Sequence, residues 1–450
     1  MSKGKSITLL SIISTIVAFV LVMSFIRFPI GIKNYNSLLG AIDLDYDLNG
    51  GVAYTFTLSS DNEEEVENIE DVVDVMEYRL DALGYGAYSV KAIKSTDVGV
   101  EDYAIRVETK ATDTLSSDIE VIGAHGELKF FGGTSEEEVT TEILQGIDVI
   151  KSAKFNGEVT VGQYEIEIEF TKAAYDELMK LIKSEAAYFL KITLGDSHEH
   201  DGHVHENVLF QNQVDETYFN KRVMPLYSAD ETSAKQMVLQ IESGGFPYIY
   251  EHDGGVVISS PYGEDVALKC AVAIIVTATV LMAVMVVAYK GFGIITALSS
   301  LLFILAEGWL LIAVPNIVLN MGGVVGVLSA PLLCNVGMTI LAKRVKEEIS
   351  TGKKTAKAAI NKAFKKALVP TISINVIAGI VSLSLLAFTS GVVKGFAITF
   401  GIGAVVSLIS TLVFTRMYNA LIMPLVKDKE KFIGVVNDKS TQVEATGEEA

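Results

Sequence analysis

Long apolar runs occur at both ends of this chain, and more than two hundred mostly polar residues separate them. A bilayer core needs about 20 consecutive apolar residues for one helix. The first such run is Ile7–Phe28, and five more follow one another closely, at roughly Val266–Tyr289, Ile294–Val314, Ile317–Ala342, Leu368–Phe388 and Phe396–Pro424. The pattern therefore predicts a membrane protein with six transmembrane helices, one before the polar segment and five after it.

The first apolar run has two interpretations, a cleaved signal peptide or a permanent anchor. Lys3 and Lys5 precede it, as in a signal peptide. However, the run is too long for a signal peptide. The residues that follow, Arg27-Phe28-Pro29-Ile30, contain no small-x-small cleavage site. We therefore expect residues 1–29 to form an uncleaved transmembrane helix.

The polar segment, residues 30–265, alternates between helix and strand patterns. Apolar residues between Glu63 and Leu83 recur on one face of a helix, and Gly84 ends it. Tyr164–Phe170 alternates apolar residues with glutamates, which is typical of a strand with one buried face. Further strands are predicted at Tyr103–Glu108 and Val256–Ser259, and further helices at Thr171–Ser184 and Ala229–Ser243. We expect ferredoxin-like α+β sheets, divided into two subdomains at residues 30–140 and 141–265.

Composition agrees with a chain divided between lipid and water. Hydrophobic residues make up 50% of the 450 residues, and the mean hydropathy is +0.39. These values exclude a disordered chain and are high for a soluble enzyme. The net charge is nevertheless −19. Residues 30–265 contain about 46 Asp and Glu against about 16 Lys and Arg, so the acidic excess lies in the polar segment.

The charge pattern also predicts the orientation of the helices. Cytoplasmic loops of membrane proteins are rich in Lys and Arg. Nine such residues lie between the fourth and fifth runs: Lys343, Arg344, Lys346, Lys353, Lys354, Lys357, Lys362, Lys365 and Lys366. With six spans they share a side with both termini. We therefore expect cytoplasmic termini, an extracytoplasmic segment 30–265, a helix bundle at 266–425 and a cytoplasmic acidic tail at 426–450.

Five short motifs stand in a fixed order along this topology. Paired glycines in the first allow a tight turn, which is its simplest interpretation. The motifs are Asp47-Leu48-Asn49-Gly50-Gly51-Val52, Arg79-Leu80-Asp81-Ala82-Leu83-Gly84, Gly126–Phe130, Lys343-Arg344-Val345-Lys346-Glu347-Glu348, and Gly391–Gly403 with Lys394-Gly395-Phe396 inside it.

In this order the motifs resemble those of SecD, a membrane subunit of the bacterial Sec protein-export machinery. The resemblance covers nearly the whole chain. It implies an RND-type half-bundle that works with a SecF-like subunit beside the SecYEG channel. It also implies a domain that grips unfolded preproteins, coupled to proton entry. The matching residues are Asp47, Leu48, Gly50, Gly51, Arg79, Leu83, Gly84, Arg344, Glu347, Glu348, Lys394, Gly395 and Phe396.

The chain departs from this family at its proton-carrying positions. The resemblance implies an Asp in the fourth span, where this chain has Val336 beside Asn335. In the fifth span the family has an Asp-Ala-Asn run, where this chain has Ser373 two residues before Asn375. Neither Val nor Ser can accept a proton in the physiological range. Proton coupling is therefore either lost or carried by another group.

Glu307 is the one acidic residue left within the spans. A charge in the bilayer costs about 2.5–3.5 kcal/mol on insertion scales, so such a residue is a candidate site. The alternatives are a protonated Glu, or one bonded to a polar neighbour such as Lys269. Glu307 with Asn335, Ser373 and Asn375 forms a candidate ion path. The amides could equally be interhelical hydrogen-bonding groups.

Four of the six histidines lie together in the polar segment, at His198, His200, His203 and His205. Imidazole is the usual ligand of zinc, nickel and copper, so these are candidate metal ligands. Their irregular spacing and Gly202 favour a solvated loop with incidental metal affinity, and a pH sensor is a third option.

Several classes of function are disfavoured. The two cysteines exclude a disulfide framework, and the pI near 4.8 argues against nucleic acid as a partner. No catalytic triad, P-loop or dinucleotide motif is present, so we expect neither an enzyme nor a cofactor. The rivals to a SecD-like subunit are an RND-type exporter of lipids or small molecules and a membrane-anchored binding module. The first two motifs disfavour the exporter, and five further spans disfavour the anchored module.

Overall fold

The computed structural model contains two compact units. Residues 1–50 and 259–450 form the first, which we call the membrane unit, and residues 51–258 form the second, the sheet unit. The structure describes residues 3–434 apart from 27, 31–32, 36, 59–68, 95–102, 125–127, 136–138, 140, 146–148, 185–187, 195–197, 201–202, 206–207, 245–249, 315–316 and 352–354.

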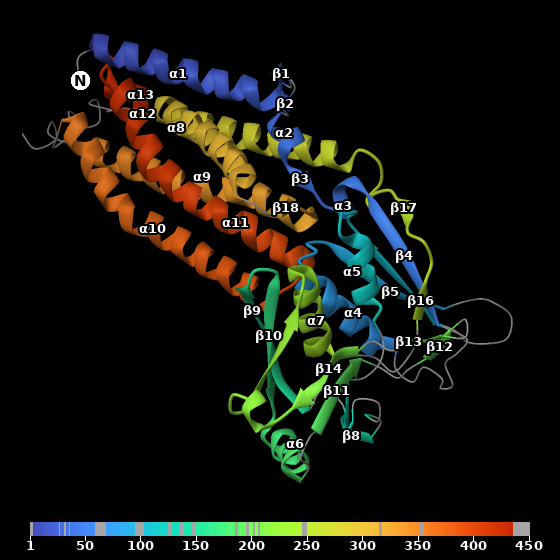
Figure 1. The fold of residues 1–450 in the computed structure, drawn as a ribbon. Helices are drawn as coiled ribbons and strands as arrows, with labels where there is room; N and C mark the ends of the chain where they lie inside the picture. The colour runs from blue at the N-terminus through green and yellow to red at the C-terminus, as the bar shows by residue number, and fades with distance from the viewer. Residues whose placement is uncertain are drawn as a thin grey trace, which may run out of the picture. The chain divides into compact units, whose positions relative to one another are not determined.

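Within these ranges, five helices of the membrane unit are long and apolar enough to cross a bilayer. They are α1 (Lys3–Phe25), α8 (Val266–Ala313), α9 (Met321–Ser350), α10 (Ala356–Phe388) and α11 (Gly391–Ile409), which continues through one π-turn, Ser410–Phe414, into α12 (Thr415–Ile422). Figure 1 shows them as a bundle of long, roughly aligned rods.

Helix α8 contains two of the predicted spans. A straight helix of 48 residues would measure about 72 Å, more than twice the thickness of a bilayer core. The helix breaks at Lys290, whose φ of 51° and ψ of −126° are not helical. The predicted spans 266–289 and 294–314 lie on either side of this break, so the five long helices provide the six expected spans.

Two helices extend beyond their predicted apolar runs. Helix α9 runs on to Ser350 and α10 begins at Ala356, whereas apolar content predicted boundaries at residues 342 and 368. The added turns carry lysine and glutamate. A hydropathy criterion cannot find them, because helix continues outside the bilayer when its side chains pair with one another.

A short parallel pairing joins distant parts of the membrane unit. Strand β3 (Asp43–Leu44) pairs with β18 (Val318–Leu319), which lies just before α9. The chain between α1 and the sheet unit also forms β1 (Phe28–Ile30), β2 (Lys33–Tyr35), α2 (Leu38–Ala41) and α3 (Tyr46–Asn49), and α13 (Lys429–Ile433) follows α12. The first of the sequence motifs is therefore anchored to the start of α9.

The first sheet of the sheet unit is antiparallel and has the strand order β16-β4-β6-β5. Helix α4 follows the first of these strands in the sequence and α5 follows the third, which is the βαββαβ arrangement of a ferredoxin-like fold. The bounds are β4 (Gly51–Leu58), α4 (Ile69–Leu83), β5 (Tyr88–Lys94), β6 (Tyr103–Thr109), α5 (Leu115–Ile122), β16 (Tyr250–His252) and β17 (Val256–Ile258), which also pairs with β4.

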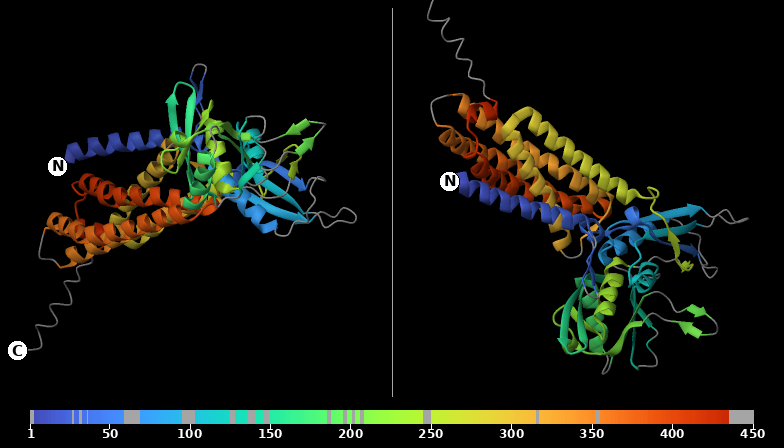
Figure 2. Two further views of the ribbon diagram at one scale, coloured as in Figure 1. Left: turned by 60° about the horizontal axis from the view of Figure 1, so that its bottom comes forward. Right: turned by 90° about the horizontal axis from the view of Figure 1, so that it is seen from above.

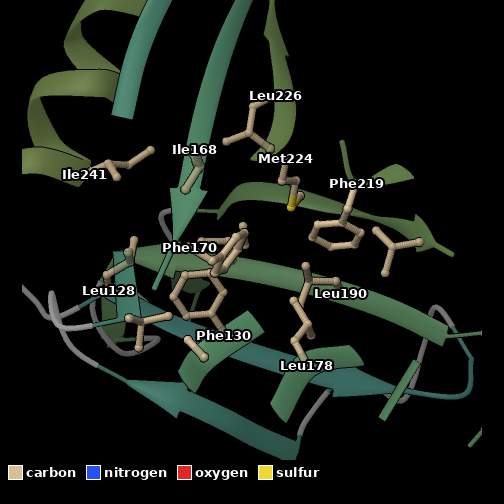
Figure 3. Packing of buried hydrophobic residues seen from close by; sticks show 14 of the residues in the cluster. Leu128, Phe130, Ile168, Phe170, Leu178, Leu190, Phe219, Met224, Leu226 and Ile241 are labelled. Atoms are coloured by element: carbon tan, nitrogen blue, oxygen red, sulfur yellow. The ribbon is translucent and has the colours of Figure 1, made fainter. Parts of the chain in front are cut away.

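The rest of the sheet unit contains two antiparallel sheets that share one core. Their orders are β14-β11-β7-β8 and β15-β10-β9. In β10 (Gln163–Phe170), Ile166, Ile168 and Phe170 are buried, as their alternation with glutamates predicts. Figure 3 shows Phe130 of β7 and Leu190 of β11 in this core beside Ile168 and Phe170.

The remaining elements of this part are β7 (Leu128–Gly133), β8 (Thr141–Gln145), β9 (Ile150–Thr160), α6 (Lys172–Ser184), β11 (Tyr188–Leu194), β12 (His198–His200), β13 (His203–His205), β14 (Val208–Val214), the 3-10 turn Glu216–Tyr218, β15 (Val223–Ser228) and α7 (Glu231–Ser243). Predicted strands and helices at 103–108, 164–170, 171–184, 229–243 and 256–259 are confirmed within a few residues. The start of the helix predicted at 63–83 lies outside the described residues.

The predicted boundary between residues 140 and 141 does not separate the sheets. Strand β7 lies before it but pairs with β11, while β16 and β17 lie after it but pair with β4. The chain builds three strands of the ferredoxin-like sheet, makes the other two sheets, and returns to complete the first. Local patterns cannot reveal this insertion, because the closing strand pairs across almost the whole unit. In Figure 2, the blue strand β4 and the yellow-green strand β17 lie side by side, although they are far apart in the sequence.

Candidate functional site

Arg79, from the second motif, is a buried cation that binds the ends of two helices. Its side chain has no exposed surface. Its guanidinium donates to the carbonyls of Ile122 (2.9 Å), Ala124 (2.7 Å) and Gly244 (2.6 Å) and to the hydroxyl of Ser243 (3.0 Å). These acceptors lie at the C-terminal ends of α5 and α7, where carbonyls lack helical partners and carry partial negative charge.

Burial lowers the pKa of Arg79 to about 10, so the side chain is protonated at neutral pH. Gly84 then ends α4 with a φ of 90°, a conformation that favours glycine. Leu83 packs against the hydrophobic core of the ferredoxin-like sheet and its helices. The second motif therefore joins α4 to the ends of α5, from the ferredoxin-like fold, and α7, which packs in the core of the other two sheets.

Asp47, from the first motif, meets the opposite end of a helix. Its side chain is buried, and Oδ2 accepts a hydrogen bond of 2.7 Å from the backbone N–H of Met321, the first residue of α9. The partial positive charge at a helix N-terminus favours a carboxylate there. Burial nevertheless raises the pKa of Asp47, and its Oδ1 has no hydrogen-bond partner among the described residues.

The residues that follow Asp47 in the first motif also have structural roles. Leu48 packs in a small core with Val266, Leu319 and Val324. Gly50 adopts a φ of 82° and its N–H closes α3 on the carbonyl of Tyr46. Gly51 begins β4.

Small residues bring α9 and α11 into close contact along the bundle. Gly322, Gly326 and Ala330 on α9 are spaced by four residues, as are Gly395, Thr399 and Gly403 on α11. A Cβ atom on Gly326 would collide with Thr399, and one on Gly403 would collide with Ala330. The hydroxyl of Thr399 donates to the carbonyl of Gly323 at 3.0 Å. This is the small-xxx-small packing of membrane helices.

The last motif takes part in this contact. A Cβ on Gly395 would collide with Asn320, the residue that caps α9 by accepting from the N–H of Gly323. Phe396 stacks on Phe400 one turn later, with 5.2 Å between ring centroids, and Lys394 is half-buried. The first and last motifs therefore both meet the start of α9.

The fourth motif forms ion pairs at the other end of α9, which we call the basic end of the bundle. Glu348 is 8% exposed and lies 2.5 Å from Nζ of Lys366 and 2.9 Å from Nζ of Lys362, both on α10. Arg344 pairs with Glu347 at 2.8 Å on the helix surface. The motif therefore joins the extended parts of α9 and α10.

Glu307 lies in the interior of the bundle, as a functional intramembrane acid should. Only 2% of it is exposed, and its Oε1 has no hydrogen-bond partner among the described residues. Its carboxylate lies against Gly403 of α11, where the missing side chain leaves room for it. Lys269, considered as its partner, instead donates to the carbonyl of Glu264 at 2.9 Å. No cation pairs with Glu307 among the residues that the structure describes.

The predicted path residues divide between two faces. Asn335 and Asn375 are buried, and each donates to the carbonyl four residues earlier in its own helix, at 2.8 and 2.9 Å. Ser373 is exposed on α10, so it does not lie with them. Val336, at the position where the resemblance implied an Asp, is 47% exposed. A carboxylate at that position would point out of the bundle.

Sequence reasoning missed a set of small polar residues that surround Asn335 and Glu307. Cys334 is fully buried and faces the hydroxyls of Ser407, Ser410 and Thr411. Ser410 begins the π-turn and donates to the carbonyl of Ser299 at 2.9 Å. Buried polar atoms that have no hydrogen-bond partner within the described part of the chain extend through four helices: Glu307 Oε1, Asn335 Oδ1, Thr371 Oγ1, Asn375 Oδ1, Ser407 Oγ and Thr411 Oγ1.

These residues give the bundle a polar interior. Buried polar groups normally find a partner, and ordered water is the usual one when protein supplies none. The only sequence signal was the spacing of Ser407 and Thr411, four residues apart in an apolar run. That spacing does not tell which helix faces them. A π-turn within a helix is also often found at functional sites.

The four clustered histidines lie on a backbone hairpin, in which β12 pairs with β13 and His198 stands opposite His205. Their side chains lie outside the described residues. Metal binding there stays a hypothesis of the sequence.

Known proteins are similar to this chain in both sequence and fold. No family model matches the chain. The SecD subunit of Dictyoglomus turgidum is 24% identical over 419 residues, which is 92% of this chain and 98% of that protein. The SecD subunit of Acidaminococcus fermentans is 22% identical over 92% of this chain and 91% of its own length. The chain is therefore similar to SecD subunits of protein translocases over nearly its whole length and theirs.

The fold of the SecD family is confirmed independently. A crystal structure of SecDF in its super-membrane-facing form superposes with a TM-score of 0.71 at 17% identity, over 94% of this chain. The chain spans 58% of that SecDF chain. The predicted combination of six spans with an inserted α+β segment is therefore that of a SecD-type membrane protein.

Proposed function

We propose that this chain is a SecD-like subunit of a protein-export translocase. It assists the movement of preproteins across the cytoplasmic membrane after the ATP-driven step. The observation that supports this function is the match to SecD subunits over nearly their whole length. In addition, motif residues join helices within each unit, Arg79 in the sheet unit and Asp47 in the membrane unit.

The orientation that we propose follows the distribution of charge. The basic end carries Lys362 and Lys366. Helix α1 begins at this end of the bundle, with Lys3. Short loops rich in Lys and Arg stay in the cytoplasm. The termini would then be cytoplasmic and the sheet unit extracytoplasmic.

A SecF-like subunit is the proposed partner within the membrane. Helix α10 exposes large apolar side chains, among them Val369 and Leu383, each 67% exposed in the isolated chain. Lipid or a second bundle must cover this surface. We infer that a SecF-like subunit supplies this second bundle and that the pair works beside a SecYEG channel.

Unfolded preproteins are the proposed substrate of the sheet unit. Its sheets end at strands such as β5, β9 and β14, whose outer edges pair with no other strand of the described sheets. An extended polypeptide can add to such an edge through backbone hydrogen bonds, with little dependence on its sequence.

Translocation in reconstituted vesicles tests the function. Vesicles containing SecYEG, the export ATPase and a SecF-like subunit would be prepared with and without this chain. A preprotein would be halted part-way by removing ATP. We expect the chain to increase the fraction that completes transport afterwards. Equal completion in both preparations would contradict the proposed function.

Glu307 is the proposed proton carrier, since it is the buried carboxylate nearest the polar interior. In the same vesicles, a proton gradient should stimulate completion with the wild-type chain. With Glu307→Gln, completion should fall to the level seen without a gradient, and Glu307→Asp should restore part of the stimulation.

The matched control is Glu264→Gln, which removes an exposed carboxylate outside the spans. It should respond to the gradient like the wild type. If Glu307→Gln retains full stimulation, the proton route through Glu307 is wrong, although assistance without a gradient would still support the export function.

A further inference from the structure

A cavity of about 600 Å³ lies at the basic end of the membrane unit. Its size falls within the roughly 300–1,000 Å³ typical of small-molecule sites. It is formed by the start of α1, the first turns of α10, the end of α12 with the residues after it, and the start of α13, which Figure 1 shows close together. It is separate from the polar interior around Glu307, with which it shares no lining residue.

Four cations line this cavity: Lys3, Lys357, Arg416 and Lys429. No carboxylate is among the lining residues, and none of the four forms an ion pair among the residues that the structure describes. Their neighbours Lys362 and Lys366 differ, because both form an ion pair with Glu348. The cavity therefore concentrates positive charge that the protein does not balance, although this basic end elsewhere does form ion pairs.

The walls between these cations are apolar. Ile360, Phe364, Met423 and Pro424 supply them, and the guanidinium of Arg416 lies over the ring of Phe364, 6.0 Å from its centroid. Two amides, Asn361 and Asn419, add hydrogen-bonding groups, and Oδ1 of Asn419 is buried and has no partner among the described residues. A soluble anion would need the charges alone. A ligand with both an anionic group and hydrocarbon also uses the apolar walls.

The cavity lies where a ligand with an anionic group and hydrocarbon is available. Lys3 begins α1, and the apolar run of that helix starts only at Ile7. Arg416 likewise is the second residue of α12, the short last part of the final span, and follows the π-turn that ends the apolar run of α11. The cavity thus lies where spanning helices leave the hydrocarbon, at the level of lipid headgroups. Basic pockets between transmembrane helices at this level recognise anionic headgroups.

We propose that this cavity binds the phosphate headgroup of an anionic phospholipid. The lysines and Arg416 contact the phosphate, and the apolar walls receive the upper part of the acyl chains. The lipid would then join α1, in which Ser6 and Ser24 are the buried residues among those described, to α10 and α12. This site does not depend on the export function, and the proposed orientation decides only which leaflet supplies the lipid.

Lipid binding to the full-length protein in detergent tests the site. Native mass spectrometry would count bound phosphatidylglycerol, with phosphatidylcholine as the zwitterionic comparison. The test variant is Lys357→Gln with Arg416→Gln, both exposed positions. Each basic residue near an anionic lipid contributes about a fivefold change in affinity, so the pair should weaken binding about 25-fold.

The matched control is Lys343→Gln with Lys346→Gln, which removes the same charge from exposed positions of the basic end outside the cavity. It should bind phosphatidylglycerol as the wild type does. Arg416→Lys, which keeps the charge, should retain most of the binding and shows that the position tolerates change.

Three results would overturn the proposal. The first is an equal loss in the control, which would indicate diffuse attraction to the basic end. The second is equal binding of phosphatidylcholine. The third is displacement of phosphatidylglycerol by millimolar inorganic phosphate or glycerol phosphate, which would identify a soluble phosphate compound as the ligand.

Discussion

Two buried charges in this chain are matched to opposite ends of helices. Arg79 meets the carbonyls that close α5 and α7, and Asp47 meets the first N–H of α9. The partners named here are backbone groups and, for Arg79, one serine hydroxyl as well. Each charge is balanced by backbone groups that a helix end leaves without partners. Both motif residues therefore have a structural role within this chain.

Replacing Arg79 should destabilise the sheet unit. Arg79→Met fills similar volume but leaves several buried carbonyls without donors, at about 1–3 kcal/mol for each unsatisfied group. We expect a total loss of about 3 kcal/mol or more. Hydrogen exchange of the full-length protein should show faster exchange in α4, α5 and α7.

Arg106→Met is the matched control. Arg106 is a partly exposed strand residue whose ion pair with Glu108 is worth less than about 1 kcal/mol. It should leave exchange in the three helices unchanged. Equal effects of both variants would show that Arg79 is not the structural joint described above.

Asp47 should make the membrane unit more stable at lower pH. Its pKa is raised in the folded chain, so the folded state holds the proton more tightly than the unfolded state does. Stability therefore falls as pH rises from the unfolded value of about 3.8 through the raised folded value, and is constant above it.

Asp47→Asn keeps an acceptor for the N–H of Met321 and removes the buried charge. Its thermal stability should exceed that of the wild type at pH 8, and the difference should shrink as the pH falls towards 5. Asp47→Ala, which removes the acceptor, should be less stable than the Asn variant throughout. A difference between Asn and wild type that does not vary with pH would contradict this account.

At the scale of residues, the sequence indicated which positions matter but not which way they face. Ser373 and Thr371 lie two residues apart on α10, yet one is exposed and the other buried. A helix that is apolar all round shows no amphipathic stripe from which to assign a face. Val336 is the same case, since its outward position was not readable from the run that contains it.

At the scale of elements, the contact between α9 and α11 depends on residues without side chains. Helices in a membrane gain little from hydrophobic burial, because lipid is as apolar as their side chains. Close backbone approach is then the main source of attraction. The glycines of the last motif permit that approach, which gives them a structural role that their sequence pattern alone did not show.

Gly322→Ala should separate these helices and lower the thermal stability of the protein in detergent. A Cβ at Gly322 would collide with the backbone carbonyl of Val392, which cannot rotate away as a side chain could. We expect a loss of about 1–3 kcal/mol, as for other overpacked sites.

Gly379→Ala provides the control, because a Cβ at this position of α10 meets nothing within 4 Å. It should be neutral or stabilise by up to about 1 kcal/mol through helix propensity. If both substitutions lower the melting temperature equally, the close contact of α9 with α11 is not what stabilises the bundle.

The spans were predictable because the bilayer imposes a length on every apolar run. The order of the sheets was not, because strand pairing depends on partners far away in the sequence. Figure 1 shows β16 and β17 beside β4, although the two inserted sheets lie between them along the chain. No property of residues 250–258 indicates that β4 is their partner.

At the scale of the whole molecule, each unit is closed by a segment from far along the chain. In the membrane unit, β3 follows the first helix but pairs with β18 before α9. In the sheet unit, the last strands complete a sheet begun by the first. In both units, therefore, an early segment pairs with one much later in the chain, so the units are not built from successive stretches of sequence.

This arrangement has a consequence during synthesis. Thr57 of β4 contacts Glu251 of β16, 194 residues later in the chain. At about 5–20 residues per second, one edge of β4 waits roughly 10–40 s on the ribosome for its partner. The inserted sheets are complete in sequence before then. They can therefore fold first, and the last strand to be translated determines when the older half of the unit becomes resistant to proteases.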